Sequence, residues 1–404
     1  MTDSAAPAAL ENAVEAVLAD ALDLSHRVHA TPEIAFQEHR AARWTADLLE
    51  RHGFEVTAPA GGLDTAFVAR WRGSAGGPVI AFAGEYDALP EVGHGCGHNL
   101  MCSSSAGAAV AAARVLGRDF GGEIRFMGTP AEEAGNGKVH LIGAGLFEDV
   151  DVCLQIHPAD LTSAEVICLA VTEIGVEFHG TLAHASADPW LGKNALDAIV
   201  LLHTMVAQWR QHLKPGERVH GIITHGGAAP NIVPELTRGR WYLRTPVDDD
   251  LDAMVERFRG MAEAAAAATG CSVELAHDPT NRCRTMLNNP TLVELWLRQL
   301  ADAGIENEPP DPNAGSTDMA NVSHEVPTIH PYMAIAPRGT PGHSHEFATY
   351  AGGEDGDAML PQAIRVLAGT AVELIRDASL VDQAWEGLRA QGGGRRRGPQ
   401  ENGA

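Results

Sequence analysis

GEYDALPEVGHGCGHN, residues 84–99, lies between an apolar β-rich run at 79–83 and a stretch of small, helix-compatible residues at 103–116. A strand, a glycine-rich loop and a helix in this order are typical of an α/β domain. Within the loop, Cys96 and His98 are separated by one glycine and preceded by another. Thiolate and imidazole bind borderline-soft divalent metals, and glycines let the main chain turn close to an ion. The stretch therefore predicts a metal site; core packing, the alternative for Cys96, fits poorly between two glycines.

The rest of the first half repeats this alternation of strands and helices. We expect helices over 8–52, interrupted at Pro32, and strands at 65–71, 123–128 and 152–156. Buried strands alternating with helices predict an α/β fold with a mostly parallel sheet. Candidate ligands follow the expected strand ends: Asp87, the pair Glu132 and Glu133, and His157. Sites in open α/β sheets form at the carboxyl ends of strands, so we expect these side chains to meet.

Between 174 and 287 the order of elements changes. The expected strands are 175–182, 219–225, 239–246 and 272–276, and the expected helices are 194–212 and 251–268. This βαββαβ order is the ferredoxin-like unit, here inserted as a lid or dimerisation domain. The catalytic domain is then discontinuous, with parts at 1–173 and 288–390. The Gly- and Arg-rich segment 391–404 is expected to be a disordered tail.

Composition and charge narrow the class of protein. The chain has 404 residues, 45% of them hydrophobic, and a formal net charge of −24. Such an acidic surface repels nucleic acid and anionic membranes, so we expect neither as a partner. No apolar run is expected to reach the roughly 18–20 residues that span a bilayer, and the N-terminal segment carries acids where a secretory signal needs bases. Together with six cysteines at irregular spacing, these features predict a cytoplasmic protein without a disulfide framework.

The adjacent glutamates of TPAEEAG, Glu132 and Glu133, are a second chemical signal. A pair of this kind is usually a solvated surface feature, but here it follows an expected strand and precedes the loop sequence Ala-Gly-Asn-Gly. Neighbouring side chains on extended backbone point in opposite directions, so one carboxylate can bind metal while the other handles protons. His157 and one of His343 and His345 would supply further ligands, which is the inventory of a two-metal hydrolase.

Further motifs extend this pattern along the chain. They are HRVHATPEIAFQEHRAA at 26–42, PAEEAG at 130–135, HGTLAHASADPWLGKNALDA at 179–198, GGAAPNIVPE at 226–235 and GSTDMANVSHEVPTIHP at 315–331. With them the chain resembles, from about residue 20 to 375, the co-catalytic metallopeptidase family that contains aminoacylase-1, carboxypeptidase G, hippurate hydrolase and auxin-conjugate amidohydrolases. Its Cys-Gly-His motif followed by Asn99 is similar to the branch with aminobenzoyl-glutamate hydrolase and aminoacylase-1-like protein 2, a β-alanyl dipeptidase.

The resemblance implies roles for the residues at the metal site. It implies that Cys96 bridges two metals, that His98, Glu133, His157 and His343 are the other ligands, that Glu132 is the general base, and that Asp87 is an acid behind the ligands. The alternative for Asp87 is a plain turn residue. Phe347, four residues after His343, favours that histidine over His345, whose alternative is a surface position.

Two positions in the same loop are harder to interpret. Residue 85 is glutamate where many members of the family have a metal-binding histidine. The cysteine branch lacks that histidine too, so the resemblance implies that the shell of the first metal is completed elsewhere. His94 is interpreted as a solvated loop histidine rather than as a ligand.

Substrate contacts are implied by the resemblance at five further positions. His184 matches a histidine of the inserted domain that reaches over the substrate carbonyl, often from the other subunit of a dimer; its alternative is a strand-end histidine. Asn231 and Arg244 match substrate-binding positions, although Arg244 also fits a solvated strand residue. Ser316 and Thr317 suit the binding of a substrate carboxylate, and a plain turn is the alternative there.

These residues predict a two-metal amidohydrolase that cleaves a small N-acyl amino acid or dipeptide, of the aminobenzoyl-glutamate or β-alanyl-dipeptide type. The expected cofactors are two divalent ions, zinc or manganese with cobalt as a further candidate, and the expected assembly is a homodimer through the inserted domain. One rival is a catalytically silent protein that binds metal and ligand in the same cleft, but such a protein would not need Glu132. A structural zinc–thiolate site is the other rival, and structural sites usually have closed, cysteine-rich shells.

Overall fold

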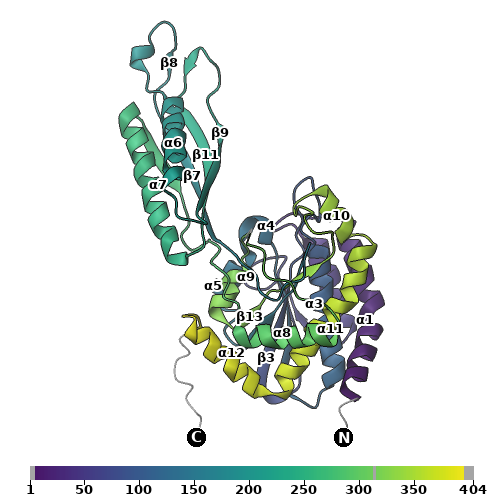
Figure 1. Ribbon diagram of the computed structural model, residues 1–404. Coiled ribbons are helices and arrows are strands. Elements are labelled where there is room, and N and C mark those ends of the chain that lie inside the picture. Colours follow the sequence, from purple (N-terminus) through teal and green to yellow (C-terminus); the bar gives the residue numbers. More distant parts are fainter. Residues whose placement is uncertain (1–4, 313–314, 395–404) are drawn as a thin grey trace. The chain divides into compact units, whose positions relative to one another are not determined.

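The central sheet of the catalytic unit has six strands. The structure is a computed structural model that describes residues 5–312 and 315–394 (Figure 1). The strands, in sheet order, are β1 (Glu55–Thr57), β2 (Phe67–Arg72), β4 (Gly121–Gly128), β3 (Ser74–Gly84), β5 (Val152–Leu154) and β13 (Thr328–Ile329). The last four strands run parallel to one another. Strand β2 pairs antiparallel with β4 on one side and with β1 on the other. The mostly parallel α/β sheet predicted from the sequence is confirmed.

The strand expected at 152–156 is divided in two. After β5 the chain changes partner, and β6 (His157–Ala159) pairs in parallel with β14 (Tyr332–Ala334) instead of β13. His157 therefore begins a short second strand instead of following a long one. It is still delivered beyond the carboxyl edge of the main sheet, as the site requires.

Helices pack on the sheet and on one another around a single large core. They are α1 (Ala5–His29), α2 (His39–Arg51), α3 (His98–Leu116), α4 (Glu132–Gly135), α5 (Gly137–Gly143), α8 (Pro290–Asp302), α9 (Met319–Glu325), α10 (His345–Ala351), α11 (Glu354–Arg376) and α12 (Ala378–Ala390). Alanine, glycine and serine dominate α3, and these small side chains let α1, α11 and strand β3 approach it closely.

One described helix, α11, is long and apolar enough to meet the length and composition test for a membrane span. In its most apolar window, 72% is buried inside the protein, as in the core helix of a globular domain. Arg365 and Glu373 interrupt α11, so it does not contain an uninterrupted apolar run of that length. The packing of α11 against α3 and α1 accounts for its apolar composition.

The second unit, Cys168–Thr285, has its own hydrophobic core. Its elements are β7 (Ala170–His179), α6 (Ala195–Trp209), β9 (Arg218–His225), β11 (Leu236–Thr245), α7 (Asp248–Thr269) and β12 (Ser272–Ala276). The antiparallel sheet has the order β12-β7-β11-β9, and both helices pack on it and on each other. This is the ferredoxin-like topology expected from the βαββαβ order. The unit starts six residues before the expected boundary at 174 and ends two before 287.

A short ribbon extends the second unit. It pairs β8 (Ala183–His184) with β10 (Ile232–Val233), and the 3₁₀ turn Pro189–Leu191 lies beside it. At the other end of the chain, residues 391–394 form a turn in which the Gly394 amide donates to the His324 carbonyl, at 2.9 Å. The tail expected to be disordered from 391 is thus ordered over these four residues; positions 395–404 lie outside the described part of the chain.

Candidate metal centre

Four parallel strands end at one edge of the sheet, and a titratable residue follows each of them. Glu85 and Asp87 follow β3, Glu132 and Glu133 follow β4, His157 follows β5, and His330 follows β13. Since these strands are neighbours in the order β4-β3-β5-β13, their carboxyl ends bring the side chains into one cluster. The cluster therefore arises from the sheet, although its members are up to about 250 residues apart in the chain.

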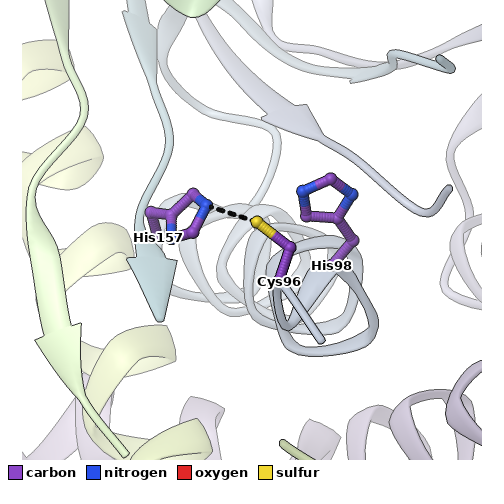
Figure 2. A group of neighbouring side chains, drawn as sticks. All are labelled: Cys96, His98 and His157. Carbon is purple, nitrogen blue, oxygen red and sulfur yellow. Dashed lines mark hydrogen bonds between the residues drawn. The ribbon is translucent and has the colours of Figure 1, made fainter. Parts of the chain in front are cut away.

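Cys96 lies at the centre of this cluster. Its Sγ is 3.3 Å from Nε2 of His157, and Figure 2 shows Cys96 between the rings of His157 and His98. The potential ligand atoms of these three residues all lie within 4.8 Å of one another. Those of Cys96, Glu133 and His343 satisfy the same condition. Two sets of three ligands thus share one sulfur atom, which is the arrangement that a bridging thiolate between two ions requires.

Backbone conformation places the loop that carries Cys96 and His98. Gly97 adopts φ +82°, and a Cβ there would lie 2.9 Å from the Pro158 side chain, so glycine is needed on both counts. His343 also has a positive φ, of 57°, and its amide donates to the Gly95 carbonyl at 2.9 Å. His345 is exposed at the start of α10. The structure therefore brings His343, not His345, to the cluster.

Asp87 connects two of the candidate ligands. Its Oδ1 and carbonyl oxygen accept from Nδ1 of His98, at 3.0 and 2.9 Å, and its Oδ2 accepts from the Glu133 amide, at 2.9 Å. With the proton on Nδ1, Nε2 of His98 is the atom left to bind an ion. The turn interpretation of Asp87 is thus replaced by a position directly behind the ligands.

The residues fit a divalent cation. Within the described residues, Nε2 of His98, Oε1 of Glu133 and Oε2 of Glu85 are buried and have no hydrogen-bond partner. Buried polar atoms without partners are costly, and an ion coordinated by several of them removes this cost. One thiolate with imidazoles and carboxylates is a donor set suited to zinc, manganese or cobalt.

Glu38 supports the loop that carries the paired glutamates. Its Oε1 accepts from the amides of Phe36 and Ala131, both at 2.9 Å, and both of these residues have positive φ. Ala131 is the residue before Glu132, so Glu38 stabilises the turn that directs Glu132 and Glu133. Burial raises the pKa of Glu38 to about 7.

Beneath the cluster lies a buried ion network that the sequence analysis missed. Nζ of Lys138 is 2.5 Å from Oε1 of Glu85 and 2.6 Å from Oδ1 of Asp318, and all three residues are fully buried. Gly137, next to Lys138, allows this approach, because a Cβ there would clash with the Pro130 carbonyl. The available signal was a lysine directly after the sequence Ala-Gly-Asn-Gly, in the first turn of α5, but the sequence gives it no visible partner.

Burial and charge shift the pKa values around the centre in different directions. Burial raises the pKa of Cys96, with Glu133 adding to the effect, and burial followed by Glu85 and Glu133 raises that of Glu132. Burial also lowers the pKa of His157 to about 4. Burial alone would raise the pKa of Glu85, but Lys138 and then His98 lower it to about 2. Bound cations would favour the thiolate and carboxylate forms over the protonated ones.

Two further histidines lie in the interior near this site. His94 is only 2% exposed and neither ring nitrogen has a hydrogen-bond partner in the described residues, so the interpretation as a solvated histidine was wrong. Burial lowers its pKa to about 3. His330 is 1% exposed, with its ring centroid 5.6 Å from that of His157. A histidine after a two-residue strand carries no signal of burial, which is why His330 was not identified.

The predicted substrate residues are distributed over both units. In the catalytic unit, Thr317 is buried and its Oγ1 accepts from the Met319 amide, while the neighbouring Asp318 joins the ion network. Ser316 is half-buried. Thr317 therefore has a structural contact of the kind expected for a plain turn.

In the second unit, His184 and Asn231 lie together on the β8–β10 ribbon, where the Ala185 amide donates to the Asn231 carbonyl at 3.0 Å. Their neighbours line a pocket of about 460 Å³ formed by Ala185, Asn194, Leu196, Ile232, Val233, Pro234 and residues 226–230. Arg244 is near the other end of β11, roughly 25 Å along the strand from the ribbon. The structure does not group it with His184.

Comparison with known proteins identifies the family. The model of the peptidase family M20/M25/M40 matches residues 81–373. The chain belongs to this family. It is 37% identical to the Xaa-Arg dipeptidase of Mus musculus, over 91% of this chain and 88% of that protein. It is 35% identical to a p-aminobenzoyl-glutamate hydrolase chain of Escherichia coli K12, over 73% of this chain and 65% of that protein.

A solved M20-family structure has the same fold. The chain matches a dinuclear metal-binding peptidase of Bacillus subtilis with a TM-score of 0.62 and 21% identity, over 89% of this chain and 99% of that one. Membership of the M20/M25/M40 family makes this protein a metal-dependent amidohydrolase, as the resemblance implied. The silent-binder alternative is not supported.

Proposed function

We propose that this enzyme hydrolyses the amide bond of a small dipeptide or N-acyl amino acid with a free carboxylate, using two divalent ions, zinc or manganese, that share Cys96. The observation that carries the proposal is the pair of ligand sets with one common sulfur, Cys96/His98/His157 and Cys96/Glu133/His343. Ions held there would supply a Lewis acid for the amide carbonyl. Dipeptides ending in arginine and aminobenzoyl-glutamate are the first candidate substrates, because the relatives named above act on them.

Glu132 is proposed as the group that handles protons. It lies next to the ligand Glu133, and one of its oxygens is 4.0 Å from Nε2 of His98, so it is close to the ions without being required by either ligand set. It would take a proton from the attacking water and deliver it to the leaving amine. Burial raises its pKa, which suits a carboxylate that must hold a proton between these two steps.

His184 is proposed as the donor to the oxygen of the carbonyl under attack. Its Nδ1 accepts from the amides of Ser186 and Ala187, at 3.2 and 3.1 Å, so the neutral ring carries its proton on Nε2. A neutral imidazole with a free N–H is the form that donates to an oxyanion. Asn231, on the same ribbon, is proposed to contact the substrate, together with Arg244, Ser316 and Thr317.

We further propose a homodimer formed through the second unit and a cytoplasmic location. Strand β9 is at the edge of its sheet and exposes Ile222, and Trp190 and Leu191 are exposed on the nearby turn. An exposed apolar edge of this kind is a candidate surface for pairing with a second chain. None of the six cysteines, all of which lie in the described part of the chain, forms a disulfide, which suits a reducing compartment.

The experiment is a substrate panel with metal-reconstituted enzyme. Aminobenzoyl-glutamate, β-alanyl-lysine, a dipeptide ending in arginine, hippurate and simple N-acyl amino acids are tested with zinc, manganese and cobalt, alongside metal analysis. We expect two ions per chain, turnover of at least one substrate, and loss of both in Cys96→Ala. Two tightly bound ions and full turnover in Cys96→Ala would refute the shared-sulfur centre. A fully loaded enzyme that hydrolyses none of the panel would refute the proposed substrate class.

A further inference from the structure

Glu85 is a carboxylate of the cluster that belongs to neither ligand set with Cys96 and that has neither the proton-handling role of Glu132 nor the ligand-orienting contacts of Asp87. It occupies a position at which many members of the family, though not the cysteine branch, have a histidine ligand, and it follows β3 directly. We infer that Glu85 is itself a ligand of the ion that His98 binds, and that Lys138 fixes its carboxylate for this purpose. The inference rests on the proposed function and names a residue of the same site.

The first argument is the contact between Glu85 and His98. Oε2 of Glu85 is 3.3 Å from Nε2 of His98, yet neither atom has a hydrogen-bond partner within the described residues. Nδ1 of His98 donates to Asp87, so Nε2 of the neutral ring offers a lone pair, as Oε2 does. Two buried lone pairs at this distance repel each other unless a proton or a metal ion lies between them, and an ion bound at the cluster would supply that positive charge. The ligand atoms of Glu85, His98 and Glu132 also lie within 4.8 Å of one another.

The second argument is the contact that fixes Glu85. Nζ of Lys138 binds Oε1, and the same Nζ binds Oδ1 of Asp318, whose Oδ2 accepts from the Lys138 amide at 2.8 Å. With Oε1 held, Oε2 has one orientation, toward His98. Two carboxylates around one ammonium also leave an excess negative charge in a fully buried place. An uncompensated buried charge is costly, and a metal cation beside it lowers that cost.

The chain offers a matched pair of variants. Glu85→Gln and Asp318→Asn each remove one negative charge from the surroundings of Lys138, but only the first alters the group that faces His98. A role in metal binding and a role in holding Lys138 therefore predict different results. Glu85→Asp, which keeps the charge and withdraws the carboxylate by one methylene, serves as a second variant in case Glu85→Gln does not fold.

The experiment titrates the metal-free full-length protein with Co²⁺ and records stoichiometry, affinity and the visible absorption of bound cobalt. We expect two ions per chain in the wild type. In Glu85→Gln the affinity for one ion should fall more than about 100-fold, and the absorption spectrum of bound cobalt should change. Loss of a residue that only hydrogen-bonds to a ligand typically costs about 10- to 100-fold in affinity. Glu85→Asp should show the same changes. Asp318→Asn should bind both ions with less than about a tenfold loss and an unchanged spectrum.

Two results would overturn the inference. One is a Glu85→Gln protein with the affinity and spectrum of the wild type; the other is an Asp318→Asn protein that changes as much as Glu85→Gln does. If the wild type itself binds fewer than two cobalt ions, the two-ion centre of the proposed function fails. If the wild type binds two and Glu85→Gln binds them equally well, the role of Glu85 alone fails.

Discussion

The catalytic unit and the inserted unit present their functional residues in opposite ways. Glu85, His98 and Lys138 are completely buried, and each is held by contacts from its own unit. His184 and Asn231 are exposed on a two-stranded ribbon whose contacts are mostly backbone hydrogen bonds. This difference indicates that the core of the catalytic unit positions the metal-site residues, whereas only local contacts position the proposed substrate-facing residues of the inserted unit. Variants in the two regions should therefore fail in different ways.

The largest effect is expected at the paired glutamates. Glu132→Gln should keep both ions and lower kcat by about 10²–10⁴, because it removes the general base while leaving the ligands in place. Glu133→Gln should lower the metal content as well, because Oε2 of Glu133 faces His343 at 3.6 Å in the shared cluster. Metal analysis and steady-state kinetics on the two variants check this. The opposite pattern would mean that the two roles are exchanged.

A smaller decrease in kcat, without any loss of bound metal, is expected for a variant in the inserted unit. His184→Ala should reduce kcat by about 10²–10³, the typical cost of removing an oxyanion donor. The metal content should stay at the wild-type value, since both ligand sets lie in the catalytic unit. A drop in metal content of His184→Ala would contradict the separation of roles between the two regions.

The same variant shows whether His184 acts within its own chain. Chains carrying His184→Ala are mixed with chains carrying Glu132→Gln, under conditions in which subunits exchange. If His184 acts across a dimer, hybrid dimers regain activity because one of their two sites has both groups intact. No recovery would exclude action across the dimer.

How far the sequence predicts the structure also differs between the regions. The strand–loop–helix pattern around Cys96, with ligands after each strand, predicts the cluster because parallel strands end at a common edge. The Glu85–Lys138–Asp318 network could not be predicted, because it depends on long-range burial that pairs residues 180 positions apart. The burial of His94 could not be predicted for the same reason, because a histidine between two glycines is expected to be solvated unless the packing of the surrounding loop is known.

In the inserted unit, topology was predictable and function was not. Alternation of polar and apolar residues along β7 and β11 follows directly from a sheet covered on one face. His184 lies on the β8–β10 ribbon, which leads into β11 at Leu236, whereas Arg244 lies near the far end of β11. Motif matching alone grouped them together as substrate residues.

The edge of the second unit gives a test of assembly. Ile222→Lys should weaken self-association, because a charge on the exposed strand β9 opposes both edge pairing and apolar burial. Leu297→Lys, on the partly exposed face of α8 in the catalytic unit, is the control and should leave the assembly unchanged. Light scattering after size exclusion gives the mass of each variant. Dissociation by Leu297→Lys, with Ile222→Lys still dimeric, would move the interface to the catalytic unit.

The smallest effect concerns Glu38, the buried support of the catalytic unit. Its folded pKa of about 7 lies above the ordinary value of 4.5, so the folded state favours the protonated form. The stability that this group contributes is present below pH 4.5 and is lost as the pH rises through 7. Between pH 4.5 and 8 the wild type should lose up to about 3 kcal/mol relative to Glu38→Gln, which keeps an acceptor for the Ala131 amide. Thermal melting of both proteins across this range measures the difference. The control is Glu263→Gln, at an exposed position of the inserted unit, whose melting temperature should change with pH in the same way as that of the wild type. If the melting temperature of Glu38→Gln also follows the wild type, Glu38 is not the source of the pH dependence.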